Sequence, residues 1–324
     1  MRKLVLDIQN LTTRFESAEG IANALDSLSL EIYEGEVVGL VGESGSGKSM
    51  TGYSIMGLVE HPGSIVGGSI HYRGQDLRLL DPEQIRNLRG DRIAMIFQDP
   101  MMSLNPVLRV DTQLVETLKA HRSIQKKEAL QRAIELLQAM GIPSPEIRLR
   151  QYPHELSGGM RQRIAIAIAL LLEPDLIIAD EPTTALDVTI QAQIIHEFQT
   201  LIEDRGTSVL WITHDLAVAS TMADRLAIMY AGQIVEQGPA EDILARPMHP
   251  YTQGLLRSIP SRNIRGKPLQ QIPGSAPSLT RLPSGCAFAP RCDQATPLCE
   301  LTPPLKQITA IRSARCHHPR EIDA

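Results

Sequence analysis

One eight-residue segment constrains the fold of this chain more than any other part of it. Residues Gly42 to Ser49 read Gly-Glu-Ser-Gly-Ser-Gly-Lys-Ser, which fits the phosphate-loop pattern G-x-x-x-x-G-K-[ST]. The apolar run Val37–Val41 before it predicts a strand, and a helix-compatible stretch follows from residue 48 to about residue 58. Glycines let successive N–H groups turn toward one centre, and a helix N-terminus favours an anion there. The segment therefore predicts nucleotide binding.

Separate roles are expected for the lysine, the serine and the backbone of this loop. The ammonium group of Lys48 should reach the β- and γ-phosphates, and the Ser49 hydroxyl should bind Mg²⁺. Contacts between the loop and the phosphates are expected at four further positions, which are Gly42, Ser44, Gly45 and Gly47. A flexible surface turn is the alternative interpretation, and the flanking strand and helix argue against it.

An apolar strand candidate, Leu176–Ala179, ends in two carboxylates, Asp180 and Glu181. In a phosphate-loop fold this strand lies beside the loop, so Asp180 is expected to hold Mg²⁺ through water. Glu181 is then expected to polarise the attacking water as general base. Taken alone, a strand that ends in Asp-Glu is more often the start of a solvated loop, and the phosphate loop changes that interpretation.

A serine followed by two glycines precedes another predicted helix. Ser157 is a good N-cap residue, and Gly158 and Gly159 would let the helix N-terminus approach a phosphate closely. Considered by itself, the pentapeptide from Leu156 to Met160 is equally compatible with a capped helix that binds nothing.

Strand candidates alternate with helical patterns over most of the chain. Apolar residues recur at helical spacing between residues 110 and 140, and further helices are expected from Gly159 and over Ile190–Glu203. The other strands are expected at Leu4–Ile8, Leu28–Ile32, Ile93–Phe97, Ser208–Ile212 and Ala227–Tyr230. Such alternation predicts a parallel sheet covered on both faces.

Charge and apolar patterning exclude two classes of protein. The chain has 32 Lys and Arg against 37 Asp and Glu, a net charge of −5, and no basic run longer than a pair. Nucleic acid is therefore not expected as a partner, because binding its backbone needs clustered positive charge. The longest apolar run, Ile164 to Leu172, has nine residues, whereas a bilayer span needs about 20. The chain is expected to be soluble and to reach a membrane only through a partner.

Taken in their order along the chain, these motifs resemble those of the nucleotide-binding subunits of ABC transporters, and the resemblance covers residues 1–257. The resemblance implies an α/β P-loop ATPase fold with an antiparallel β subdomain and a helical subdomain at about residues 99–160. It also implies further site residues. Phe15 is expected to stack on the adenine, Gln98 to sense Mg²⁺ and face the membrane subunit, and His214 to contact the γ-phosphate. Across the dimer, Ser157, Gly158 and Gly159 are expected to bind the γ-phosphate that the opposite subunit holds, and Asp187 is expected to lie at the same interface. Met160 departs from the family, which usually has Gln there, so altered ribose contacts are expected.

The segment Met248-His249-Pro250-Tyr251 resembles the motif that opens the C-terminal extension of oligopeptide/dipeptide importer ATPases. The resemblance implies an ATPase subunit that powers peptide uptake at the cytoplasmic face of the inner membrane as a peripheral protein. Its implied partners are a second, related ATPase subunit, two transmembrane permease subunits and, indirectly, an extracytoplasmic peptide-binding protein. A soluble ABC ATPase acting on a ribosome or on DNA is the alternative, but such proteins typically have two cassettes or a long coiled-coil insertion.

The extension, residues 258–324, is rich in proline and holds every cysteine of the chain. The prolines are expected to interrupt any regular element, and a segment of this kind builds little core alone. Four thiolates gathered there suggest a metal centre, formed by Cys286, Cys292, Cys299 and Cys316. Zinc sites usually contain C-x2-4-C pairs, whereas a [4Fe–4S] cluster tolerates wider spacing. Zinc and free or disulfide-bonded thiols are the alternatives, and the resemblance favours the cluster, because related peptide-importer ATPases carry one in this extension.

Overall fold

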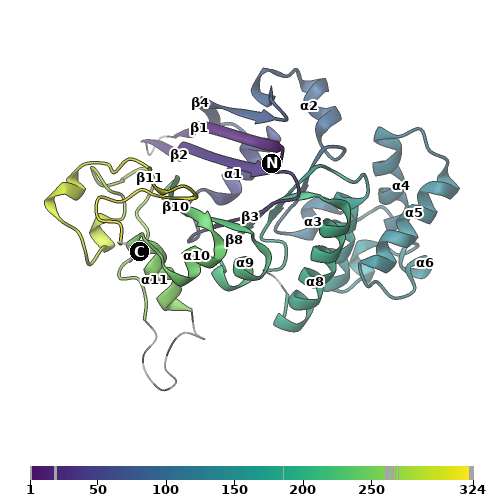
Figure 1. Ribbon diagram of the computed structural model, residues 1–324. Helices are drawn as coiled ribbons and strands as arrows, with labels where there is room; N and C mark the ends of the chain where they lie inside the picture. The colour runs from purple at the N-terminus through teal and green to yellow at the C-terminus, as the bar shows by residue number, and fades with distance from the viewer. Residues whose placement is uncertain are drawn as a thin grey trace. The chain divides into compact units, whose positions relative to one another are not determined.

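The computed structural model describes residues 2–17, 20–184, 186–259, 263, 266, 268 and 270–320 (Figure 1). The described chain forms two compact units. The first unit consists of Met1–Val5, Ile32–Glu36 and Leu79–Leu210. The second consists of Leu6–Glu31, Val37–Arg78 and Trp211–Ala324.

The first unit combines three strands with most of the helices. The strands β6 (Ile93–Ile96) and β7 (Leu176–Asp180) pair in parallel, and β8 (Ser208–Thr213), which begins in this unit, neighbours β7. All five residues of β7 are buried, as expected for a parallel strand covered on both faces. The helices are α2 (Pro82–Leu88), α3 (Pro100–Ser103), α4 (Val110–His121), α5 (Lys126–Ala139), α6 (Pro145–Arg148), α7 (Gly158–Leu170) and α8 (Val188–Arg205), with η2 (Pro153–Glu155) before α7.

The helical pattern between residues 110 and 140 is confirmed as two helices, α4 and α5, separated by residues 122–125. These two helices pack against each other and α6 packs against α5 (Figure 1). Leu114 and Leu118 of α4 and Leu137 of α5 are fully buried, so the predicted apolar face is the packed face.

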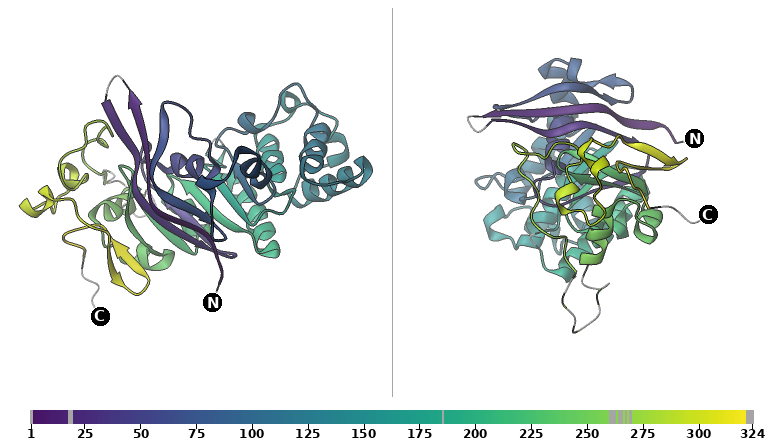
Figure 2. Two further views of the ribbon diagram at one scale, coloured as in Figure 1. Left: turned by 90° about the horizontal axis from the view of Figure 1, so that it is seen from above. Right: turned by 90° about the vertical axis from the view of Figure 1, so that its left-hand side faces the viewer.

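The second unit contains an antiparallel sheet with the strand order β2-β1-β4-β5, drawn mostly in purple and blue in Figure 2. It is formed by β1 (Leu4–Ser17), β2 (Gly20–Tyr33), β4 (Gly63–Tyr72) and β5 (Gln75–Asp76), followed by η1 (Leu77–Leu79). The strand β1 pairs antiparallel with β4, with Phe15 opposite Gly63. Alternate residues of β1 such as Leu6 and Ile8 are buried, so this sheet has one apolar face.

The same unit contains neighbouring strands in the order β11-β12-β10-β9-β3. These are β3 (Val37–Val41), β9 (Arg225–Tyr230), β10 (Gln233–Pro239), β11 (Lys306–Thr309) and β12 (Arg312–Ala314), together with the helices α1 (Lys48–Met56), α9 (Leu216–Met222), α10 (Ala240–Ala245) and α11 (Pro250–Ser258). The strands β3 and β9 pair in parallel, whereas the other pairs in this group are antiparallel.

The expectation that the prolines would interrupt every regular element of the extension is wrong. Strand β12 pairs with β10, and strand β11 pairs with β12. Two short 3₁₀ helices also form: η4 (Ala289–Arg291) lies between Cys286 and Cys292, and η5 (Pro297–Glu300) contains Cys299. The segment contributes to a core that it does not build alone. Phe288 packs edge-on against Tyr230 and Tyr251, with ring centroids 5.3 and 5.4 Å away. Shared burial with the rest of the second unit orders this segment, seen in yellow in Figure 2.

No described helix combines the length and the apolar character needed to cross a bilayer.

Candidate nucleotide-binding site

The phosphate loop occupies the predicted place between β3 and α1. The helix begins at Lys48, and Gly47 before it has φ 104°, a conformation that favours glycine. Glycine is also required at the start of the loop, because a Cβ at Gly42 would lie 2.2 Å from the carbonyl oxygen of Met229. The glycines of the pattern therefore reflect close backbone approach as well as flexibility.

The side chain of Lys48 lies inside the phosphate loop, where it is expected to bind phosphate. Its side chain is buried, and Nζ donates hydrogen bonds to the carbonyl oxygens of Gly42 and Glu43, both at 2.9 Å. These two bonds close the loop around the ammonium group and place one positive charge at its centre. The hydroxyl of Ser46 is buried without a hydrogen-bond partner among the described residues, so the loop retains unused polar capacity.

The predicted adenine-stacking residue lies on the antiparallel sheet. Phe15 is half-buried, and its ring packs against Gly63, where a Cβ would lie 2.7 Å from the ring. Part of the ring therefore remains accessible, and stacking on a base stays a prediction.

In the first unit, the acidic pair follows β7 as expected. Asp180 is buried at 2% exposure, and Glu181 has φ 45°, a left-handed conformation that is strained for a residue with a Cβ. Its Oε2 accepts hydrogen bonds from Gln98 Nε2 and from Thr184 Oγ1, both at 3.1 Å. The structure therefore brings Gln98 and Glu181 together. Thr184 was missed by the sequence analysis, although its place three residues after Glu181 in a turn is a signal for such a bond.

The serine-glycine segment forms the capped helix start that was predicted. Ser157 is the N-cap of α7, and its Oγ accepts a hydrogen bond from the Met160 N–H at 3.3 Å. Because this cap uses the backbone of Met160, the unusual side chain at that position does not disturb it. A Cβ at Gly159 would lie 3.0 Å from Ile190 of α8, whereas Ser157 and Gly158 are exposed. The helix start is therefore packed on one side and accessible on the other.

Two further predicted site residues lie at starts of helices. Asp187 caps α8, with Oδ1 accepting from the Ile190 N–H at 3.0 Å, whereas its neighbour Ala185 lies outside the described residues. His214 is exposed and follows β8 in the second unit. Of the predicted site residues, Phe15, the phosphate loop and His214 belong to the second unit. The others belong to the first unit and are Gln98, Asp180, Glu181, Ser157, Gly158, Gly159 and Asp187.

The four cysteines of the extension line one small cavity together with His249, His317 and His318. None of them forms a disulfide. Burial raises the pKa of Cys286 and Cys292, and that of Cys316 to about 11. Within the described part of the chain, no three His, Cys, Asp or Glu side chains are arranged to hold a single metal ion.

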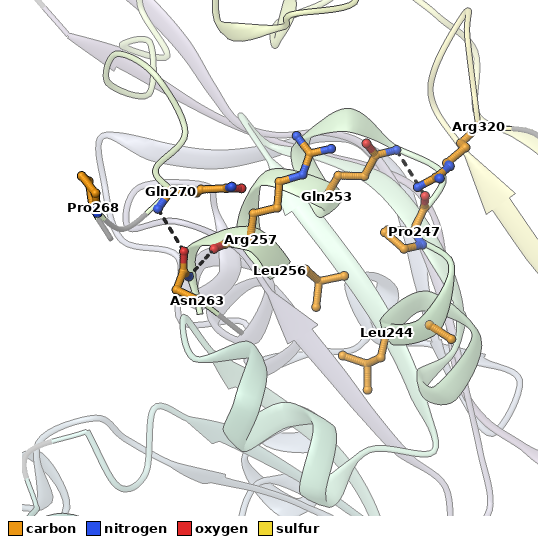
Figure 3. Close-up of a pocket in the computed structure, with 10 residues that line it drawn as sticks. Leu244, Pro247, Gln253, Leu256, Arg257, Asn263, Pro268, Gln270 and Arg320 are labelled. Carbon is orange, nitrogen blue, oxygen red and sulfur yellow. Dashed lines mark hydrogen bonds between the residues drawn. The ribbon is translucent and has the colours of Figure 1, made fainter. Parts of the chain in front are cut away.

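A separate hollow of about 400 Å³ lies beside α10 and α11 (Figure 3). It is lined by Leu244, Leu256, Arg257 and Arg320 among others, and Asn263 bridges its edge by hydrogen bonds to Arg257 and Gln270. None of the predicted site residues lines it, so this hollow does not belong to the nucleotide site.

The phosphate loop, the capped glycine turn and the acidic pair, in this order along the chain, define an ABC-type ATPase. Residues 25–184 match the family described as ABC transporter, and residues 235–299 match the family described as oligopeptide/dipeptide transporter, C-terminal region. The chain belongs to the ATP-binding subunits of oligopeptide and dipeptide ABC importers. It is an ATP-hydrolysing subunit of a peptide importer, so the predicted ABC ATPase fold and the predicted peptide-import function are confirmed, whereas the cysteine extension stays a prediction. An action on ribosomes or DNA is not favoured.

Two relatives and two solved structures illustrate the family membership. The chain is 48% identical to a peptide import ATP-binding protein of Brucella melitensis, covering 100% of this chain and 99% of the relative. It is 44% identical to the oligopeptide transport ATP-binding protein OppD of Escherichia coli, covering 98% and 94%. Among solved structures, a dimeric ATP-binding cassette with bound ADP and phosphate has a TM-score of 0.66 at 30% identity, covering 72% of this chain and 98% of that one. The cbiO1 subunit of a Clostridium perfringens ABC transporter has a TM-score of 0.64 at 25% identity, covering 75% and 91%.

Proposed function

We propose that Glu181 is the general base of ATP hydrolysis and that Gln98 orients it. The observation that carries this proposal is the pair of hydrogen bonds to Glu181 Oε2 from Gln98 and Thr184. A carboxylate held at one oxygen presents the other in a defined direction, which a base needs in order to polarise one water molecule. The strained backbone of Glu181 is typical of functional positions.

The remaining residues are assigned to ATP and Mg²⁺. We propose that Lys48 and the loop backbone bind the phosphates, that Phe15 stacks on the adenine and that His214 contacts the γ-phosphate. Mg²⁺, which neutralises charge on the phosphates when bound, would be held by Ser49, Gln98 and Asp180. Oxygen donors of this kind suit Mg²⁺.

ABC ATPases of peptide importers work as dimers with transmembrane permease subunits. We propose that Ser157, Gly158, Gly159 and Asp187 of a neighbouring ATPase complete the site around the γ-phosphate. The exposed Ser157 and Gly158 at the start of the 13-residue helix α7 support this, because a helix N-terminus attracts anions. Closure would order the site, and hydrolysis would reopen it and drive transport.

The finer composition of the complex is also a proposal. The neighbouring ATPase would be a related but distinct subunit, and a peptide-binding protein outside the membrane would act indirectly. The chain would lie at the cytoplasmic face of the inner membrane as a peripheral protein. Residues 1–257 would form the ATPase domain, with its helical subdomain at about residues 99–160, and residues 258–324 the extension.

Co-purification tests this composition. The tagged chain, expressed at its native level and extracted in detergent, is expected to co-purify with two hydrophobic permease subunits and one further ATPase. A homodimer bound to the permeases would overturn the mixed ATPase pair. Co-sedimentation with ribosomes, without permeases, would contradict the transport assignment itself.

For the cysteines, we propose a [4Fe–4S] cluster with a structural or regulatory role. All four thiols line one cavity, which supports a shared group, and their spacing lacks the C-x2-4-C pairs that are usual for zinc. Iron atoms at separate corners of a cube require thiolates that lie farther apart than those around a single ion. Backbone N–H groups donate to Cys292 Sγ at 3.4 Å and to Cys316 Sγ at 3.3 Å, contacts that stabilise thiolates.

Metal analysis of anaerobically purified protein checks this proposal. About four iron and four sulfide per chain are expected, and Cys299→Ser should lower both. His317→Ala, which changes a side chain on the same cavity, serves as the control and should retain the iron. Stoichiometric zinc, or no metal after anaerobic purification, would overturn the cluster.

A further inference from the structure

Every polar group of Glu43, the second residue of the phosphate loop, is bonded. Its N–H donates to Tyr251 Oη at 2.9 Å, and its carbonyl oxygen accepts from Lys48 Nζ at 2.9 Å. Its carboxylate forms a bidentate ion pair with Arg291, with Nη1–Oε2 at 2.7 Å and Nη2–Oε1 at 3.0 Å. Two of these partners, Tyr251 and Arg291, come from the C-terminal part of the chain, 208 and 248 residues away. All of these residues belong to the second unit.

Arg291 is itself held in place from several sides. Its side chain is 7% exposed, its Nε donates to the carbonyl oxygen of Pro273 at 2.9 Å, and Nη1 also lies 3.3 Å from Tyr230 Oη. The guanidinium carbon lies 5.8 Å from the ring centroid of Tyr230 and 5.9 Å from that of Phe288, within cation–π range. The hydrogen bond to Glu43 raises the pKa of Arg291, so the charge is permanent. A planar, bidentate and anchored guanidinium fixes the carboxylate in one orientation.

Tyr251 is equally constrained. The side chain is fully buried, and its ring packs on Tyr230 with centroids 4.7 Å apart. Burial raises its pKa, so the hydroxyl stays protonated and accepts the Glu43 N–H as a neutral group. Tyr251 is the second residue of α11, and Arg291 is the last residue of η4, between Cys286 and Cys292. The C-terminal part of the chain, from α11 onward, thus holds the loop from two separate elements.

We propose that Tyr251 and Arg291 are positioning residues for nucleotide binding, through which the C-terminal part of the chain, from α11 onward, sets the affinity of the phosphate loop for ATP. Arg291 neutralises a carboxylate beside the expected phosphate position, and Tyr251 fixes the backbone of Glu43, whose carbonyl oxygen accepts from Lys48. Without Arg291, the Glu43 carboxylate would be free to turn toward the phosphates and repel them. This inference rests on the proposed role of Gly42 to Ser49 in phosphate binding.

Titration of the full chain with a fluorescent ATP analogue tests the proposal. Arg291→Met is expected to raise the Kd about tenfold, and Arg291→Lys, which keeps the charge but not the bidentate geometry, should raise it less. Tyr251→Phe, which removes one hydroxyl, should raise the Kd about threefold. Measured kinetics should show a higher KM for ATP with kcat changed little, because only binding is affected.

A matched control separates positioning from general stability. Arg312 of β12 forms a buried ion pair with Glu236 at 2.9 Å, also within the second unit, and neither residue contacts the loop. Arg312→Lys, or Arg312→Met if that variant folds, should lower the Tm at least as much as Arg291→Met and leave the Kd unchanged. A proportional change of Kd and Tm across the Tyr251, Arg291 and Arg312 variants would overturn the proposal.

A double-mutant cycle tests whether the effect passes through Glu43. If Arg291 acts through the carboxylate of Glu43, the double variant Glu43→Gln with Arg291→Met should raise the Kd for ATP by less than the two single effects added together. Additive effects would overturn the assignment. An unchanged Kd in Arg291→Met would also overturn it, provided that Lys48→Ala weakens binding. If Lys48→Ala has no effect either, the proposed role of the loop itself fails.

Discussion

Replacing Glu181 with glutamine is expected to lower the rate of ATP hydrolysis about 10²- to 10⁴-fold, the usual contribution of a general base. Glutamine is nearly isosteric and can keep the hydrogen bonds with Gln98 and Thr184, but it cannot accept a proton from water. ATP should therefore still bind, and the variant should accumulate as an ATP-bound closed dimer. Steady-state phosphate release measures the rate, and size-exclusion chromatography with ATP and Mg²⁺ measures the dimer.

Glu173 provides a matched control for this substitution. Glu173 lies just before β7, whereas Glu181 lies just after that strand. Glu173 also has a positive φ, 55°, but its side chain is exposed. Glu173→Gln makes the same chemical change on a similarly strained backbone and should hydrolyse ATP at the unmodified rate. Hydrolysis by Glu181→Gln at more than about a tenth of the normal rate would remove Glu181 from its assigned role.

Replacing Lys48 with alanine is expected to weaken ATP binding itself. The change removes a buried positive charge and both hydrogen bonds to the carbonyl oxygens of Gly42 and Glu43. Loss of one hydrogen bond to a charged group costs about 1.5 to 3 kcal/mol, which corresponds to a Kd about 10- to 100-fold higher. Equilibrium titration with the fluorescent analogue measures this change directly, independently of turnover.

An exposed lysine on α4, Lys119, supplies the control, because Lys119→Ala removes the same charge far along the chain from the loop. Its Kd should equal that of the unmodified protein. The two predictions are also distinct from each other, since Lys48→Ala changes affinity whereas Glu181→Gln changes turnover. If Lys48→Ala bound ATP normally, the phosphate loop would not be the nucleotide site.

The strand and helix around the phosphate loop could be predicted almost residue by residue. Strand β3 has the predicted bounds, and α1 begins at Lys48, because glycines that permit a tight turn and a helix start are local properties of the chain. The strands β7, β8 and β9 are each within two residues of prediction at both ends, since buried parallel strands are short apolar runs. The ends of strands and helices that depend on local residue chemistry could therefore be predicted from the sequence.

The extension shows where local patterns are insufficient. Its prolines predicted irregular chain, yet Lys306–Thr309 and Arg312–Ala314 form strands because β10 offers a partner for β12. Strand formation there depends on a hydrogen-bonded neighbour remote in sequence, and intrinsic preference contributes little. The cysteines were predicted to gather, and they do line one cavity, but their relation to the phosphate loop carried no sequence signal.

By itself, the sequence determined the chemistry of the protein: which residues can bind phosphate, which carboxylate can accept a proton and where the chain can turn. These are properties of residue type and short spacing, so they can be inferred from the sequence without a structure. Only the tertiary structure decided that Glu43 is paired with Arg291, because a contact between residues 248 positions apart depends on how the intervening chain packs. That packing joins the cysteine-bearing extension to the loop that is proposed to bind ATP.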